Sequence, residues 1–141
     1  MIVTTAVALL GAGCSRRPAA TGPIPQDPTV VVEQFLAAVK ANNLSTMGTL
    51  WGTEKGPASR TMARSDLEKR LTVIQSYLVH ERYAIERTDP GVTSDERVVR
   101  VRLTRLGCTP VVPFTVARYR TGWLVSGIDL EAAGNPRRSC G

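Results

Sequence analysis

The sequence predicts a single α+β domain in which N-terminal helices pack on a curved antiparallel sheet. Three observations lead to this fold class. The chain has 141 residues, a length that fits one domain and leaves little room for a second. Up to residue 78, apolar residues recur at the spacing of amphipathic helices. Beyond it, apolar and polar residues alternate as in half-buried strands, and helices followed by a run of strands are typical of α+β folds.

The first helix is expected to begin at Asp27 and Pro28. Aspartate is a favourable N-cap residue, and proline is favourable at the first helical position. One apolar stripe follows at spacings of three and four residues, formed by Val32, Phe35, Leu36 and Val39. Asn42 and Asn43 mark the expected end of this helix.

Two further helices are expected before the sheet. The first is short, covers residues 45–51 and precedes a loop at 52–57. Ser65 and Glu68 have the spacing of a capping box, which predicts the start of the second. Its apolar stripe is formed by Leu67, Leu71, Ile74 and Leu78.

The strands form the second half of the domain. Val99, Val101 and Leu103 alternate with polar residues, which predicts a half-buried strand. Turn-forming residues over 89–95 and at Thr121-Gly122 separate the strands on either side of them. The expected strands lie around Tyr83 and Ile85 and over residues 99–104, 111–120 and 123–130.

These elements resemble a known superfamily. The opening helix after Asp27-Pro28, the Leu50-Trp51 end of the small helix and the closing hairpin 117–125 are similar to the nuclear transport factor 2-like superfamily, including its small bacterial lipoproteins. The resemblance covers residues 29–131 and implies a cone of sheet and helices around an apolar cavity. Because such folds host dehydratases, isomerases, ligand binders and interaction modules, the fold leaves the function open. Another small cystatin-like α+β domain is the structural alternative.

The N-terminal residues have the character of a signal peptide. Residues 2–13 are uncharged and mostly apolar, and they lead directly into Cys14. The stretch 10–14 resembles the lipobox of bacterial lipoproteins, although Gly11 stands where that family prefers leucine and no basic residue precedes the apolar segment. The resemblance implies removal of residues 1–13 and attachment of diacylglycerol, with acyl chains such as palmitate, to the Cys14 thiol. An unlipidated or uncleaved exported form and a buried N-terminal strand are the alternatives.

A proline-rich segment follows the lipid site. Residues 14–28 are expected to form an extended tether, residues 29–136 the folded domain, and residues 137–141 a tail. Arg16 and Arg17 would favour anionic headgroups. The expected location is the cell membrane or the outer membrane, on the extracytoplasmic side, with the membrane itself as a partner.

Two cysteines remain once Cys14 is assigned to lipid. In an oxidising compartment, Cys108 and Cys140 are expected to form a disulfide that fixes the polar C-terminal tail. One buried and one free thiol are the alternative.

No set of residues in the sequence predicts catalysis. His80 is the only histidine, and strand alternation places it and Glu81 on opposite faces, so a surface or junction position is favoured over acid–base catalysis. The carboxylates cluster in turns and helix starts. Neither the ligand clusters of a metal site nor a cofactor motif is found, so no metal and no cofactor are predicted.

Positive charge gathers in the predicted strands. The net charge is +6, and residues 97–128 include six arginines and no acidic residue. A solvated sheet face is the favoured explanation; attraction to headgroups or anionic envelope polymers and a specific anionic ligand are the others. An exported protein meets these rather than nucleic acid, so no nucleic-acid partner is expected. The candidate contacts to an anionic surface are Arg100, Arg102, Arg118 and Arg120.

Aromatic residues are candidates for the lining of a pocket, although most of them are expected in the core. They are Trp51, Tyr77, Tyr83, Phe114, Tyr119 and Trp123. The sequence therefore predicts a lipid-anchored envelope protein with a non-catalytic binding or interaction module for a small apolar ligand. A dehydratase- or isomerase-like enzyme of the same superfamily and a scaffold of an envelope complex are the alternatives.

Overall fold

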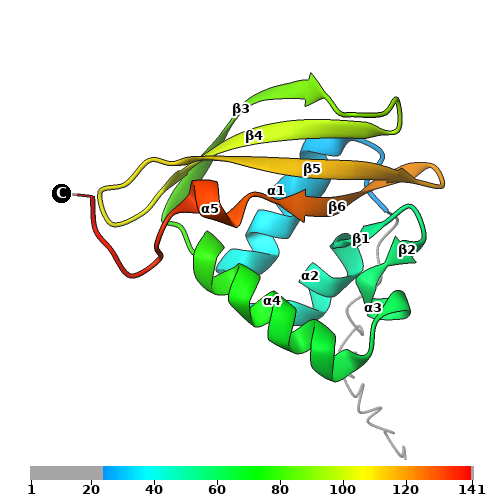
Figure 1. Cartoon of the computed structure of the whole chain (residues 1–141), viewed down its shortest axis with the longest axis horizontal. Helices are drawn as coiled ribbons and strands as arrows, with labels where there is room; N and C mark the ends of the chain where they lie inside the picture. Colours follow the sequence, from blue (N-terminus) through cyan, green and yellow to red (C-terminus); the bar gives the residue numbers. More distant parts are fainter. Residues whose placement is uncertain (1–23, 141) are drawn as a thin grey trace, which may run out of the picture.

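A computed structural model describes residues 24–140, and these residues form helices followed by a four-stranded sheet (Figure 1). The expected signal peptide, Cys14 and most of the expected tether lie outside the described residues. In chain order the elements are α1 (Pro28–Lys40), α2 (Leu44–Leu50), β1 (Gly52–Thr53), β2 (Gly56–Pro57), α3 (Ala58–Thr61), α4 (Arg64–Leu78), β3 (Arg82–Pro90), β4 (Glu96–Thr104), β5 (Val111–Tyr119), β6 (Gly122–Ile128) and α5 (Leu130–Ala133).

Helix α1 begins where the sequence predicts it. The Asp27 carboxylate accepts hydrogen bonds from the backbone N–H groups of Thr29 and Val30, which satisfies two donors of the first turn. The predicted apolar stripe is buried against the sheet. After the C-cap residue Ala41, Asn42 adopts a φ of 51° and turns the chain toward α2, which Asn43 caps.

The predicted capping box of α4 is wrong. The helix begins two residues earlier, with Ala63 as its N-cap, so Ser65 lies inside the first turn. Glu68 instead accepts a hydrogen bond from Arg64, one turn before it, at 3.0 Å. The predicted stripe of Leu67, Leu71, Ile74 and Leu78 is buried as expected.

Strands β3 to β6 form an antiparallel meander in the order β3-β4-β5-β6. Register shifts at Ile85/Arg87 and Thr115/Val116 interrupt the ladders and mark bulges. The last strand ends earlier than predicted, because Asp129 turns the chain and caps the short helix α5. The expected loop at 52–57 contains the two-residue strands β1 and β2, which pair with each other.

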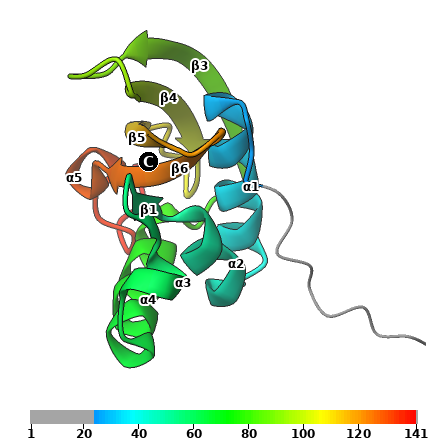
Figure 2. The same ribbon diagram turned by 90° about the vertical axis from the view of Figure 1, so that its right-hand side faces the viewer.

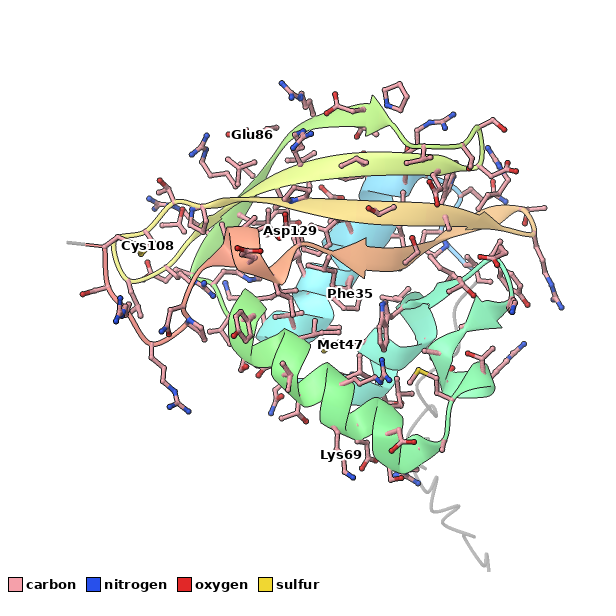
Figure 3. All side chains as sticks on the ribbon, in the orientation of Figure 1. Phe35, Met47, Lys69, Glu86, Cys108 and Asp129 are labelled. Carbon is pink, nitrogen blue, oxygen red and sulfur yellow. A yellow bond between two sulfur atoms is a disulfide. The ribbon has the colours of Figure 1, made fainter. Side chains whose placement is uncertain are left out.

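The predicted α+β architecture is confirmed. Figure 2 shows the curved sheet with α1, α2 and α4 on its concave side, and the core lies between these two layers. Phe35 and Phe114 meet edge to face across it, with ring centroids 6.5 Å apart. Phe35 and Met47 point into this space, whereas Lys69 and Glu86 point away from it (Figure 3). Fully buried side chains fill the centre of this core: Phe35, Leu36, Met47, Leu71, Leu78 and Phe114.

The segment before α1 packs on the sheet. Trp123 donates its backbone N–H to the Pro25 carbonyl at 2.8 Å, and a Cβ added at Gly122 would lie 2.3 Å from Ile24 Cγ2. The last residues of the expected tether are therefore held against β6. None of the described helices is long and apolar enough to cross a membrane.

Candidate functional site

An open groove of about 830 Å³ lies between the C-terminal half of α4 and α5 with the segment that follows it. Both apolar and polar side chains line it. The lining residues are Gln75, Ser76, Tyr77, Val79, Leu130, Glu131, Gly134, Asn135, Pro136 and Arg137. We call this site the α4–α5 groove.

The amphipathic pattern of α4 builds the first wall. Since Ile74 and Leu78 turn toward the core, Ser76 and Tyr77 face outward along the groove. Gln75 lies between these faces, and its amide donates a hydrogen bond to the Val39 carbonyl at 3.3 Å. This bond ties the groove wall to the end of α1.

Arg105 joins the two walls. Its side chain is only 6% exposed, and the guanidinium donates hydrogen bonds to the carbonyls of Tyr77, Ala133 and Gly134. These acceptors lie at the C-terminal ends of α4 and α5, where carbonyls lack helical partners and the helix dipole is negative. Burial lowers the pKa of Arg105 below its ordinary value.

The importance of Arg105 is the functional feature that sequence reasoning missed. The sequence predicts Arg105 only as one of six arginines in a basic run of strands. The available signal was strand alternation, since Arg105 continues the inward-facing series of Val99, Val101 and Leu103.

The second wall is formed by α5 and the segment after it, and a disulfide holds the end of that segment. Cys108 and Cys140 are bonded, with their Cα atoms 5.0 Å apart, as the sequence predicts. The Cys140 N–H also donates to the Leu106 carbonyl at 3.3 Å. The bond attaches the segment after α5 to the β4–β5 turn, where Leu106 and Gly107 both have positive φ.

The six candidate aromatic residues do not gather around one cavity. Tyr77 lines the α4–α5 groove, and Phe114 is part of the core. Tyr83 is largely exposed on β3, and partial desolvation of its ring together with the nearby Glu33 carboxylate raises its pKa. Trp51 is half-buried and forms a bridge with β6, whereas Tyr119 and Trp123 lie at the β5–β6 turn.

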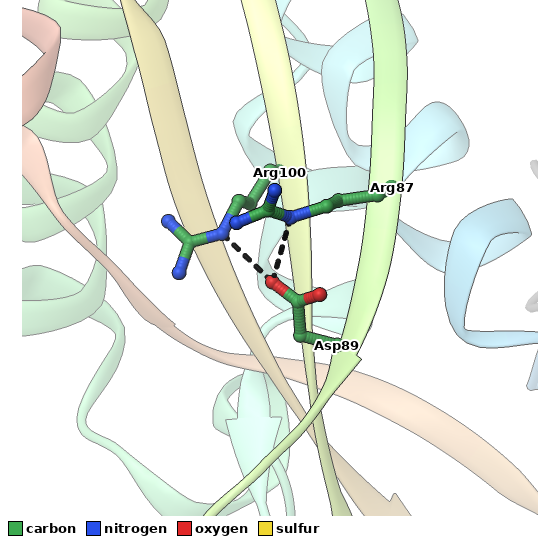
Figure 4. A network of polar contacts seen from close by, with 3 residues as sticks. All are labelled: Arg87, Asp89 and Arg100. Carbon is green, nitrogen blue, oxygen red and sulfur yellow. Dashed lines mark hydrogen bonds and ion pairs between the residues drawn. The ribbon is translucent and has the colours of Figure 1, made fainter.

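The outward-facing arginines of β4 are paired with carboxylates. Arg100 Nε lies 2.8 Å from Asp89 Oδ2, which also accepts from Arg87 at 3.1 Å (Figure 4). Arg102 pairs with Glu86. The hydrogen bond from Arg100 is the main cause of a lowered pKa at Asp89. Antiparallel pairing places the acidic residues of β3 beside the basic run of β4, so this face carries less free charge than the sequence of β4 implies.

The other two candidate arginines lie beside aromatic rings. Arg118 is 3.4 Å from Asp95, and its guanidinium carbon lies 4.5 Å from the centre of the Trp123 ring. Arg97 lies 5.5 Å from the same ring. Arg120 lies 5.1 Å from the Tyr119 ring centre. These distances are typical of cation–π contacts.

His80 occupies the junction between α4 and β3. It is buried, its Nδ1 lies 2.9 Å from the Leu78 carbonyl oxygen, and its ring meets Tyr83 edge-on. The groove does not include it. Within residues 24–140, no cluster of side chains has the composition of a metal site.

Comparisons with known proteins give one structural similarity. No protein-family model and no curated protein sequence matches the chain. The match is the phospholipid-binding protein from Ralstonia solanacearum, solved in complex with a phospholipid. The alignment covers 74% of this chain and 75% of that protein's chain, with a TM-score of 0.41 and 13% sequence identity. Similarity at this level concerns the fold alone, and the ligand belongs to that protein.

Proposed function

We propose that the protein is a non-catalytic binding module of the bacterial cell envelope, held at a membrane through lipid on Cys14, and that an amphiphilic small molecule occupies the α4–α5 groove. The observation that carries this proposal is the construction of the groove. Arg105 and the Cys108–Cys140 bond fix its second wall at two separate points. A ligand that binds to a wall already held in place loses less conformational entropy than one that must first order a free segment.

The composition of the groove favours an amphiphile. Tyr77, Val79 and Leu130 supply apolar surface, while Glu131 and Arg137 supply charge at the α5 side. A volume of about 830 Å³ falls within the range of small-molecule sites. Because buried side chains fill the space between the sheet and the helices, we propose the ligand outside this core, in contrast to the cavity that the superfamily resemblance implies.

The ionisable groups of the groove favour binding over acid–base catalysis. Among the described residues, no hydrogen bond or salt bridge links the side chains of Tyr77, Glu131 and Arg137 to one another. Arginine stays protonated in proteins, so it cannot exchange a proton as an acid–base pair requires. The groove therefore offers orientation and charge rather than proton transfer.

Two features support the envelope location. The apolar residues before Cys14 resemble a lipoprotein signal, and a disulfide persists in oxidising compartments. Both features agree with an extracytoplasmic domain on a lipid anchor.

The ligand site is tested with a fluorescent acyl-chain probe. Val79, the C-cap residue of α4, lines the groove and is 48% exposed, whereas Val73 lies within α4, is 51% exposed and is outside the groove. Val79→Glu is expected to weaken probe binding about tenfold or more, because a charge would replace apolar contact surface. Val73→Glu, the matched control, is expected to bind as the wild type does. Equal effects of the two substitutions would contradict the site.

The anchor is tested by replacing Cys14 with serine, which removes the thiol that the lipid requires. The variant is expected to move to the soluble fraction and to lose labelling by a fatty-acid probe that marks the wild type. A wild-type protein that takes up no label would contradict the anchor. Unchanged membrane partition of the Cys14→Ser variant would do the same.

A further inference from the structure

We infer that the end of the domain where the N-terminal segment leaves the fold docks on an anionic phospholipid bilayer, and that the α4–α5 groove faces away from that bilayer. The inference rests on the lipid anchor proposed above. The docking end consists of three turns, at residues 53–56, 91–95 and 119–122.

The path of the chain defines this end. Pro25 accepts a hydrogen bond from Trp123 at the start of β6, and Ile24 packs on Gly122 in the last of the three turns. The chain that leads back to Cys14 therefore leaves the domain beside the β5–β6 turn. A lipid anchor on Cys14 would therefore connect to the domain at this turn.

Contacts bring the three turns together. The β1–β2 turn lies beside Tyr119, because a Cβ on Gly56 would be 3.4 Å from the tyrosine ring. The β3–β4 loop lies beside β5, where Arg118 donates its backbone N–H to the Asp95 carbonyl at 2.8 Å. Figure 1 shows the three turns at the same end of the molecule.

The side chains of this end suit the headgroup region. Val92 is 97% exposed at the tip of the β3–β4 loop, and Arg120 lies against the Tyr119 ring. Exposed apolar side chains, amphipathic rings and basic groups are favourable at a membrane interface.

The charges of this end are balanced. Within two positions of the turns lie four basic residues (Lys55, Arg97, Arg118 and Arg120) and four acidic residues (Glu54, Asp89, Asp95 and Glu96). Asp89 and Asp95 both pair with arginine, whereas Lys55 and Arg120 form no ion pair among the described residues. The expected tether adds Arg16 and Arg17 next to the lipid site. The combined balance favours an anionic surface over a neutral one.

The groove lies at the opposite end of the sheet. Strand β6 runs seven residues from the docking end to α5, a distance of about 20 Å at the rise of a β-strand. Ten chain steps separate Cys14 from Ile24, which allows at most about 35 Å of extended chain. The docking end therefore meets the bilayer when the tether leads straight away from the domain, and the groove meets it only if the tether runs back along the length of β6.

The test uses the lipidated full chain in vesicles of phosphatidylcholine and phosphatidylglycerol. An environment-sensitive fluorophore is attached either in the variant Val92→Cys or in Val79→Cys, with the native disulfide left oxidised. Nitroxide-labelled lipid is expected to quench the label at position 92 severalfold more than the label at position 79.

Matched charge reversals test the contact itself. Lys55→Glu with Arg120→Glu is expected to reduce quenching at position 92. Lys69→Glu with Arg70→Glu changes the net charge equally on the exposed surface of α4 and is expected to leave the quenching unchanged. Quenching at position 92 that survives the first pair would overturn the docking surface.

The remaining outcomes separate the two proposals. Equal quenching of both labels on protein that sediments with the vesicles would overturn the docking orientation and leave the anchor intact. Protein that carries no lipid and does not sediment with the vesicles would overturn both.

Discussion

Arg105 donates hydrogen bonds to carbonyl oxygens that α4 and α5 leave free at their C-terminal ends. A guanidinium holds five N–H donors in one plane, so a single side chain serves acceptors from both elements. Without it, the Tyr77 and Ala133 carbonyls would lose their side-chain donor. The position of α5 relative to α4 depends on this residue.

Arg105→Met is expected to lower the free energy of unfolding by about 2–4 kcal/mol, because it leaves buried carbonyls without donors while keeping the apolar volume. Arg102→Met is the matched control. Arg102 pairs with Glu86 on the outer face of the sheet, where an exposed pair contributes about 1 kcal/mol or less. Urea unfolding followed by circular dichroism measures both values. Equal losses of unfolding free energy for the two variants would contradict the role of Arg105 in holding α5 to α4.

Elements with a strong apolar period were predictable from the sequence. The stripes of α1 and α4 and the alternation of β4 each match one buried face. The short helix α2 was predicted within one residue of its bounds, but α5 was not, since it has four residues and depends on Asp129 as a cap and on Arg105 across the fold. The start of α4 was predicted wrongly for a similar reason. Several residues around position 64 are compatible with a helix start, and tertiary packing determines which of them begins the helix.

Gly122 tests the contact between β6 and the segment before α1. An added Cβ would lie 2.3 Å from Ile24 Cγ2 and 2.9 Å from the Pro25 carbonyl oxygen. Gly122→Ala is therefore expected to displace this segment and to cost about 1–3 kcal/mol of stability.

Gly127→Ala is the control for this substitution, since its Cβ would meet Thr115 at an ordinary 3.5 Å in the same strand. It is expected to change stability by less than about 1 kcal/mol. Thermal unfolding compares the two variants. A Gly122→Ala protein as stable as Gly127→Ala would show that the segment does not pack on β6.

The whole molecule determines the α4–α5 groove, because its walls come from the middle and the end of the chain. The disulfide could be inferred by pairing the two remaining cysteines, as the structure shows. The groove itself could not be inferred, since it depends on where α5 lies and on which arginine of a basic strand points inward. The aromatic residues were a poor guide, because only Tyr77 of the six lines it.

The disulfide is expected to stabilise the whole domain. Its cysteines are 32 residues apart, so Cys108→Ser with Cys140→Ser should lose about 3–4 kcal/mol in the chain-entropy model. The same variant should also bind the acyl-chain probe more weakly at a temperature where it stays folded. A fully folded double variant with wild-type affinity would show that the bond does not shape the groove.

The central claim is that the α4–α5 groove is the ligand site, and amide chemical-shift mapping of the folded domain tests it most directly. The spectrum is recorded during titration with the acyl-chain probe. The largest shifts are expected at residues 75–79 and 130–137, with small shifts at the core residues around Phe35 and Phe114. Shifts concentrated in the core residues, or no shifts at saturating probe, would contradict the claim.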